Sequence, residues 1–420
     1  MSGKFPADTV SLSEMVMHSV SSVSQPQSMS GPLPTSRQHT SGQQPLISFV
    51  IPVYNIAAYL PRCLNSITEQ AFKDIEIIAV DGASDDASMA ILDERKKVEP
   101  RLTVLHRERI GPGSARNEGA RHARGLYIWF VDGDDLLSAD CLTAIAHSIQ
   151  LNMPDVLLTD HDIIHNNGTT ESGPGRSLMA RKTSPWFTLA DEPWVIELGM
   201  ACWNKIIRRN FFVDIDAAFL QPWPHEDIPV SYSVLLEARR LSVLNEVCYH
   251  YRKDRPGSEM KSGEPRRHFR VFDAWRPLLE DVGKRAGSGD PVITKEIRCS
   301  LFERAIWHYS IILDTGRMLT GGCGSGSYVA HRDRREFFSD MHWDYVNHAP
   351  PGYRPGGGLR GVKFRLIARN AYRTYSLLDP LNKLRMRASR ARRRVWSMRR
   401  TLSRAVVGTP AVVGSPAGRR

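Results

Sequence analysis

Three carboxylates follow a single apolar run in this 420-residue chain. The stretch YIWFVDGDDLL, residues 127–137, contains Asp132, Asp134 and Asp135, with one glycine between the first two. Carboxylates this close repel one another, and each loses hydration where the run enters a core. A divalent cation would offset that repulsion, because hard cations take carboxylate oxygens as ligands. The alternative for an isolated D-x-D pattern is an acidic, solvated loop, so the rest of the chain has to decide between them.

Two further apolar runs end in polar residues that could bind a ligand. LISFVIPVYN ends with Pro52, Tyr54 and Asn55, and IEIIAVDG reaches Asp81 near its end. Parallel sheets bind ligands at the carboxyl ends of their strands. If these runs are neighbouring strands, their polar ends lie near the three carboxylates.

The elements that must position these residues alternate between apolar runs and segments with helical spacing. Apolar runs at 46–55, 75–82, 101–107, 125–131 and 155–164 predict buried strands, and helices are predicted between them. Because the strands are continuously apolar and their connections are short, the α/β pattern predicts a mainly parallel central sheet with helices on both faces. Residues 266–313 have helical spacing and predict a C-terminal helical extension.

Composition divides the chain into four parts. Residues 1–45 are rich in Ser, Pro and Gln and are predicted to be disordered; 46–265 form the domain with the candidate site, 266–350 the helical extension and 351–420 a basic amphipathic tail. The six cysteines include no C-x-x-C pair, which is typical of reduced thiols in a cytosolic protein. The sequence has no run of about 18 apolar residues and no signal peptide, so we expect a cytoplasmic protein.

The formal net charge of +11 is concentrated near the C-terminus. From Arg360 onward the chain has 17 Lys and Arg and one acidic residue, Asp379, so the rest of the chain carries −5. Apolar residues alternate with the cations over 360–407, a pattern typical of amphipathic helices on an anionic membrane surface. We therefore expect peripheral association with the inner face of the cell membrane. Disorder and nucleic-acid binding are the alternatives, but no nucleic-acid-binding motif accompanies the tail, and no nucleic-acid partner is expected.

An ordered set of motifs between Ile47 and Arg252 resembles family-2 glycosyltransferases, which have the A-type, nucleotide-diphospho-sugar transferase fold. The set comprises SFVIPVYN, IEIIAVDGASDD, GPGSARNEGARHARGLYIWFVDGDD, CWNKIIRRNFF and HED, in this order. Each motif alone is weak, but their order within an alternating strand–helix frame is specific. Among family members, the chain is most similar to those associated with actinobacterial wall-polymer synthesis of the teichoic-acid type. The resemblance implies that 46–265 is a catalytic domain of this fold.

The resemblance also implies an inverting transfer of a sugar from a nucleoside-diphosphate donor to a hydroxyl of a lipid-linked or polymer acceptor. Asp132 and Asp134 would hold Mg²⁺ or Mn²⁺ bridging the donor phosphates. Asp135 would cap the next helix or support the site from behind. The nucleotide-sugar contacts would come from Pro52, Tyr54, Asn55, Asp81, Arg116, Asp132 and Trp203, although core packing is an equal alternative for Trp203.

The implied catalytic groups lie in HED, residues 225–227. Asp227 would take the proton from the acceptor hydroxyl, with Glu226 beside it, and His225 is an alternative base. Glu226 and a nearby metal–phosphate assembly would move the pKa of Asp227 in opposite directions. The residues alone leave the outcome open.

One position departs from the family's pattern. Where VDDGSTD is common, this chain has VDGASDD, so Gly82 replaces an acid often credited with contacting the base. A catalytically degenerate nucleotide-binding scaffold in a wall-polymer complex is therefore one alternative function, and a nucleic-acid-associated protein that uses the tail is another. Asp132, Asp134 and the Glu226–Asp227 pair favour the active enzyme over the scaffold. The acidic charge of the rest of the chain disfavours the nucleic-acid alternative.

Overall fold

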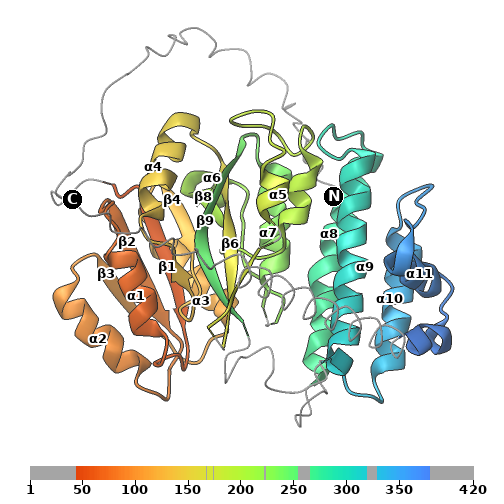
Figure 1. The fold of residues 1–420 in the computed structure, drawn as a ribbon, viewed down its shortest axis with the longest axis horizontal. Coiled ribbons are helices and arrows are strands. Elements are labelled where there is room, and N and C mark those ends of the chain that lie inside the picture. Colours follow the sequence, from red (N-terminus) through yellow and green to blue (C-terminus); the bar gives the residue numbers. More distant parts are fainter. Residues whose placement is uncertain are drawn as a thin grey trace, which may run out of the picture. The chain divides into compact units, whose positions relative to one another are not determined.

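A computed structural model describes residues 44–166, 168–173, 175–221, 224–253, 265–318 and 329–378. Strands and helices alternate through the first part of this range, as the sequence predicts (Figure 1). The first strands are β1 (Ile47–Val53), β2 (Ile75–Asp81), β3 (Leu102–His106) and β4 (Tyr127–Phe130). The helices between them are α1 (Leu60–Thr68), α2 (Ser88–Val98) and α3 (Pro112–His122).

The first four strands form a parallel half-sheet in the order β3-β2-β1-β4. Every residue of β2 and β4 is buried, which is why both read as continuous apolar runs. The chain adds β2 and β3 on one side of β1 and then returns to place β4 on the other side. Sheets of this kind bind ligands outside the carboxyl ends of the strands where the direction of winding reverses. Here that point lies between β1 and β4, next to Pro52 near the end of β1 and Asp132 just after the end of β4.

The second half of the sheet is mixed. β8 (Lys205–Arg208) is antiparallel to both β4 and β6 (Val156–His165), and β9 (Leu241–Lys253) runs parallel to β6. The short strands β5 (Leu136–Leu137) and β7 (Thr170–Ser172) pair antiparallel with β9 and β6. The helical segments of this half are α4 (Cys141–Asn152), α5 (Gly175–Met179), η1 (Pro193–Leu198), α6 (Arg209–Asp214) and α7 (Asp227–Glu237). The sheet is therefore mostly parallel near the candidate site and mixed beyond it.

Helices cover both faces of the sheet, as predicted. On β1, Phe49 and Ile51 point into a core shared with α1 and α4, whereas Val50 points into a second core shared with α3 and α7. Successive side chains of a strand point to opposite faces, so a strand buried on both faces needs apolar residues throughout. The absence of alternation in the sequence follows from this arrangement.

The predicted helical extension packs against α7 and continues the second core. It consists of η3 (Pro265–Phe269), α8 (Arg270–Gly287), α9 (Lys295–Met318), α10 (Arg334–His348) and α11 (Gly358–Ala368), with α8 and α9 side by side in Figure 1. The rings of Tyr232 on α7 and Trp275 on α8 lie 5.1 Å apart, and Phe272 contacts Tyr309 and Phe337. Over the described ranges, no helix has the length and hydropathy needed to cross a bilayer.

The predicted start of the basic tail is wrong. The boundary at residue 351 and the membrane-facing stretch from 360 both include α11, yet Phe364 and Ile367 are buried in the second core. Lys363 forms a buried ion pair with Asp314 of α9, and Tyr375 packs on Phe338 at 5.0 Å. The apolar side of this amphipathic segment contacts protein, so the folded region extends at least to residue 378. The rest of the proposed membrane segment, 379–407, lies outside the described residues.

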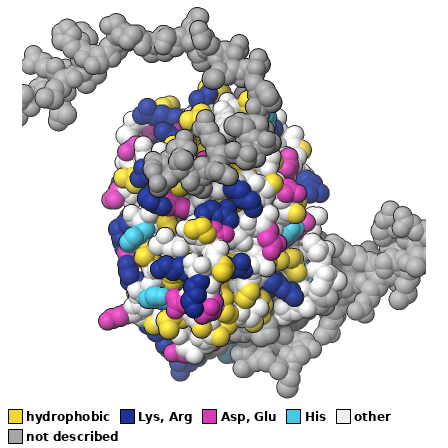
Figure 2. All heavy atoms as spheres, turned by 90° about the vertical axis from the view of Figure 1, so that its left-hand side faces the viewer, with side chains coloured by type: hydrophobic (Ala, Val, Ile, Leu, Met, Phe, Trp, Pro, Cys, Tyr) yellow, Lys and Arg dark blue, Asp and Glu magenta, His cyan; other side chains and the backbone are white. Residues whose placement is uncertain are grey.

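Positive and negative side chains are interspersed on the face of the molecule that Figure 2 shows, the end of the sheet at β3 and α2. Arg107, directly after β3, pairs with Glu118, and Lys97 of α2 pairs with Glu94. Nucleic-acid binders usually gather cations on one face. The part of this face that Figure 2 leaves visible has no such patch.

Candidate functional site

The loop after β4 is held by residues from β9. The backbone N–H of Asp132 donates to the Tyr249 hydroxyl at 3.1 Å, and that hydroxyl donates to the Asp135 carboxylate at 2.8 Å. The backbone N–H of Arg252 donates to the other Asp135 oxygen at 2.6 Å. Asp135 is buried, and burial together with Asp134 and Asp132 raises its pKa. Asp135 therefore supports the loop from behind, while Asp132 and Asp134 stay partly exposed.

Arg116 of α3 joins this loop to the segment that contains the predicted base. One guanidinium nitrogen donates to Asp132 at 2.6 Å, and another donates to Glu226 at 2.8 Å. Arg116 and Glu226 are both buried. A guanidinium suits this bridge because its planar array of N–H donors can serve two carboxylates at once. Arg116 therefore fixes Asp132 and Glu226 relative to each other. Its predicted contact with the nucleotide stays a prediction.

Asp227 is the first residue of α7 and follows Glu226 directly. Burial and the Glu226 carboxylate raise the pKa of Asp227 to about 7, against the opposing effect of Arg116. Burial also raises the pKa of Glu226, which Arg116 opposes. With its carboxylate engaged by Arg116, Glu226 positions the segment, and Asp227 is the group whose ionisation is poised near neutral pH.

His225 lies on the other side of Glu226 from Asp227. It is buried in a positive-φ conformation, with φ of 77°. Its ring contacts those of His268 and His308 in the helical extension at 5.7 and 5.1 Å. Burial, together with His308 and His268, lowers its pKa well below the usual range. His225 thus packs against the helical extension, directly before Glu226.

The ends of β1 and β2 form one hydrogen-bonded unit. The Asn55 side chain accepts from the Asp85 N–H at 2.8 Å, and the Asp81 carboxylate accepts from the Ser84 hydroxyl at 2.6 Å. The guanidinium of Arg109 lies over the Tyr54 ring at 5.0 Å. Asn55 is exposed and Tyr54 and Pro52 are partly buried, so these residues line the accessible end of β1. Asp81 is buried and supports this end from below.

Glycine at position 82 has a local packing reason. A Cβ there would lie 3.1 Å from the Ile110 carbonyl oxygen, closer than most such contacts. Any larger side chain here would require Ile110 to shift by a few tenths of an ångström. Gly82 therefore accompanies a close approach of residue 110 to the end of β2.

Trp203 lies in an aromatic stack beside the carboxylate loop, the loop after β4 that contains Asp132, Asp134 and Asp135. Its ring is parallel to that of Tyr249 at 4.5 Å and meets the edge of His161 at 4.7 Å. The Trp203 carbonyl accepts from the Trp129 indole at 2.7 Å. Next to it, buried Lys205 donates to the Ala201 carbonyl at 2.7 Å. Trp203 is partly buried, so it has a packing role and retains some exposed surface.

Comparisons with known proteins match the region that contains most of these residues. Residues 48–215 match the family model described as glycosyl transferase family 2. These residues form a family-2 glycosyltransferase domain. The chain is 31% identical over 218 residues to the uncharacterized glycosyltransferase EpsJ of Bacillus subtilis, covering 50% of this chain and 62% of EpsJ. It is 30% identical to the poly(ribitol-phosphate) beta-N-acetylglucosaminyltransferase TarS of Staphylococcus aureus, covering 51% of this chain and 37% of TarS.

A third relative is the poly(ribitol-phosphate) beta-glucosyltransferase of Bacillus spizizenii, 33% identical over 51% of this chain and 33% of the relative. This chain thus spans less than two thirds of the length of these relatives. Among solved structures, S. aureus TarS residues 1–349 in complex with UDP-GlcNAc align with a TM-score of 0.62 at 22% identity, covering 80% of this chain and 91% of that chain. This likeness confirms the predicted A-type fold, including the helices beyond the sheet.

Several residues of the candidate site were not predicted from the sequence. Tyr249 and Arg252 hold the carboxylate loop from a distance of more than 100 residues along the chain, and the Arg252 side chain also donates to the Asp134 carbonyl at 2.9 Å. Arg109 stacks on Tyr54. The alternation of aromatic and charged residues in CYHYRK, residues 248–253, was the available signal for β9. This pattern indicates a strand with polar side chains, but it does not predict that the strand contacts the loop after β4.

Proposed function

We propose that this protein is an inverting, metal-dependent glycosyltransferase acting on a wall-polymer acceptor. Its donor would be a nucleoside-diphosphate sugar, and its acceptor a hydroxyl of a lipid-linked or polymeric polyol phosphate. The names of two relatives, which act on poly(ribitol-phosphate), support this acceptor class. The TarS complex with UDP-GlcNAc supports a nucleotide-sugar donor.

The observation that carries the proposal is the bridge from Asp132 through Arg116 to Glu226. It joins the loop at the carboxyl end of β4, where a donor diphosphate would bind, to the residue directly before Asp227. A group-transfer enzyme needs its donor and its base at a fixed separation, because orientation lowers the barrier of a reaction between bound partners. A scaffold that only binds nucleotide has no such need.

Asp227 supplies the proton acceptor in this mechanism. With a pKa of about 7, its carboxylate is partly ionised at neutral pH and is a stronger base than an ordinary Asp. The acceptor hydroxyl loses its proton to Asp227 as its oxygen attacks the anomeric carbon. The bond from that carbon to the diphosphate breaks on the opposite face, which inverts the configuration.

The carboxylates present fit a divalent cation. Asp132 and Asp134 offer hard oxygen ligands at a partly exposed loop, although Arg116 occupies one oxygen of Asp132. Among the described residues, no three His, Cys, Asp or Glu side chains form a closed metal site. Mg²⁺ is often held by one or two carboxylates together with substrate phosphates, so such an open set suits it. A cation bound here would stabilise the negative charge that develops on the leaving diphosphate.

The test is metal-dependent donor binding and hydrolysis, measured across a panel of nucleotide sugars with Mn²⁺ present. We expect the wild type to bind and slowly hydrolyse one donor, and Asp134→Ala to lose Mn²⁺-dependent binding while it remains folded. Undiminished Mn²⁺-dependent binding in Asp134→Ala would remove Asp134 from the metal site. A wild type that binds nucleotides but neither hydrolyses nor transfers any sugar would favour the scaffold.

A further inference from the structure

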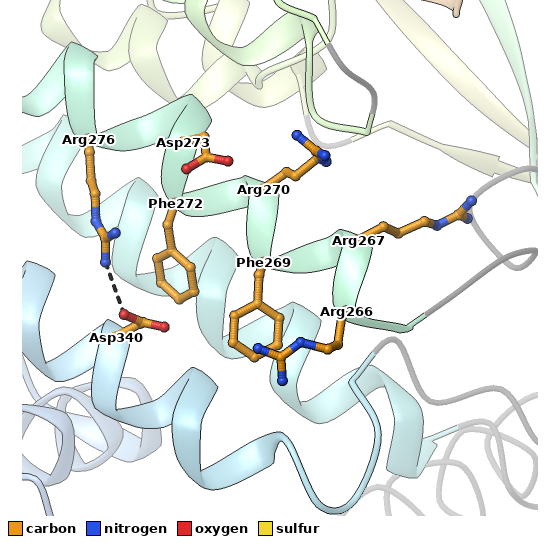
Figure 3. A pocket seen from close by; sticks show the side chains of 8 residues that line it. All are labelled: Arg266, Arg267, Phe269, Arg270, Phe272, Asp273, Arg276 and Asp340. Carbon is orange, nitrogen blue, oxygen red and sulfur yellow. Dashed lines mark hydrogen bonds and ion pairs between the residues drawn. The ribbon is translucent and has the colours of Figure 1, made fainter.

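An arginine-rich pocket lies at the start of α8 and includes Asp340 of α10 in its lining (Figure 3). Its volume is about 470 Å³, within the range of pockets that hold a small ligand. Four arginines line it, against two carboxylates; the charged lining residues are Arg266, Arg267, Arg270, Arg276, Asp273 and Asp340. None of these residues belongs to the site described above.

Internal ion pairs account for the two arginines at the ends of this set. Arg266 pairs with Asp333 and Glu336 at 2.9 and 2.7 Å. Arg276 pairs with Asp340 and Asp344 at 3.3 and 2.6 Å (Figure 3). Such pairs fix side chains and leave little charge for a ligand.

Arg270 is different from these two. It is partly exposed, and within the described ranges no acidic side chain lies close enough to form an ion pair with it. Figure 3 shows its guanidinium extended away from the ion pair of Arg276 with Asp340. An accessible guanidinium is well suited to phosphate, which it can bind through two parallel hydrogen bonds.

A small second cavity connects Arg270 to the catalytic segment. Its volume is about 30 Å³, and His225, Glu226, Arg270 and Asp273 are among its lining residues. This is room for about one water molecule. The Nε2 atom of buried His225 has no hydrogen-bond partner among the described residues. Arg270 and Asp273 thus form a shared wall between the larger pocket and the residues next to Asp227.

We propose that the pocket around Arg270 binds a phosphodiester group of the acceptor. The inference rests on the proposed function, since the phosphodiester belongs to the same acceptor molecule whose hydroxyl Asp227 would deprotonate. Most of the predicted donor residues lie near the ends of β1, β2 and β4. Arg116 joins Asp132 of this group to Glu226, which lines the small cavity together with Arg270. A phosphodiester-linked polyol has what the pocket selects: an anion for Arg270 and hydroxyls that can reach the neighbouring cavity.

The experiment measures binding of an oligo(ribitol phosphate) to the full chain by calorimetry, with no donor present. The wild type should bind the oligomer, inorganic phosphate should compete weakly, and ribitol alone should not bind. Arg270→Gln should weaken binding about tenfold, the scale of one charge-assisted hydrogen bond. The affinity of Arg270→Lys for the oligomer should lie between those of the wild type and Arg270→Gln, because lysine keeps the charge but cannot form two parallel hydrogen bonds.

Asp273→Asn is the matched variant, because its expected effect on oligomer affinity is opposite to that of Arg270→Gln. It removes the negative charge from the same wall, so it should tighten oligomer binding, which damage to the fold would not do. Arg62→Gln, at an exposed arginine of α1, is the control and should bind as the wild type does.

Wild-type affinity in both Arg270→Gln and Asp273→Asn would overturn the inference. Equal binding of ribitol and its phosphate oligomer would also overturn it, as would Arg270-dependent binding to vesicles of phosphatidylglycerol with no binding to the oligomer. Donor hydrolysis by the wild type, measured separately, tests the proposed function. The two measurements therefore distinguish a failure of the pocket assignment from a failure of the proposed function.

Discussion

At the scale of single residues, Asp227 gives the proposed reaction a specific pH dependence. Its pKa of about 7 lies above that of an ordinary Asp because of burial and the adjacent Glu226. The base is active when deprotonated, so kcat/KM for transfer should fall as pH decreases through about 7 and level off above it. Glu226 shares this environment, so the profile belongs to the pair. A pH–rate profile with a constant donor and metal concentration is the measurement. A flat profile from pH 5 to 8 would argue against Asp227.

Asp227→Asn should reduce turnover by about 10²–10⁴-fold, the usual contribution of a general base, while donor affinity is kept. A raised carboxyl pKa means that the folded state is destabilised as pH rises from about 4 through 7, since the buried group must ionise. Asparagine removes that cost, so the melting temperature of the variant at pH 8 should equal or exceed that of the wild type. If Asp227→Asn keeps its turnover while His225→Ala loses it, His225 is the base.

The sequence located the carboxylates but not their partners. Asp132 and Asp134 could be singled out because charge at the end of an apolar run is unusual, whereas the Glu226–Asp227 pair was predicted from the family resemblance alone. Arg116 could not be assigned to Glu226, since the two lie 110 residues apart and nothing local in α3 indicates that contact. The same holds for Tyr249, whose aromatic ring reads as ordinary strand packing.

At the scale of elements, strands buried on both faces were predictable, and strand direction in the second half was not. A strand that is buried on both faces has an apolar sequence. The sequence of β8 is compatible with either a parallel or an antiparallel pairing, so it does not predict the antiparallel pairing with β4. The beginning of the tail was misassigned for a related reason. An amphipathic basic segment has the same pattern whether its apolar side meets lipid or protein. In α11 that side meets α10, and Phe364 and Ile367 are buried.

The ion pair between Lys363 and Asp314 tests the docking of α11. Both side chains are buried, and Tyr375 directs its hydroxyl to the same carboxylate at 3.4 Å. Removing one partner leaves a buried charge without compensation, so Lys363→Met should lower the free energy of unfolding by about 3–5 kcal/mol. Adding Asp314→Leu should recover most of that loss, because an apolar pair of similar volume replaces both charges. Urea unfolding measures both. An unchanged stability in Lys363→Met would mean that α11 is not docked through this pair.

At the scale of the whole molecule, the net positive charge lies outside the residues that the structure describes, so folding and surface binding can be tested by separate truncations. Residues 379–420 contain twelve Lys and Arg and one acid, so they carry a formal charge of +11 and the rest of the chain is neutral. A chain ending at Leu378 should therefore keep its fold and transfer activity. A chain ending before Gly358 should unfold more readily, because it also loses the buried side chains of α11. Thermal unfolding of the two truncated chains measures this difference.

Binding to anionic vesicles should be lost in the chain that ends at Leu378. For the full chain, binding should weaken steeply with salt, because exposed charges are screened over about 10 Å at 0.1 M. Leu381, Leu384, Val395, Trp396 and Leu402 should leave some attachment at high salt, which a purely electrostatic segment would not. Co-sedimentation with vesicles, compared with binding to duplex DNA at about 0.15 M salt, distinguishes the two possible surfaces. Preference for DNA with no vesicle binding would refute membrane association and leave the catalytic proposal untouched, since every proposed catalytic residue precedes 379.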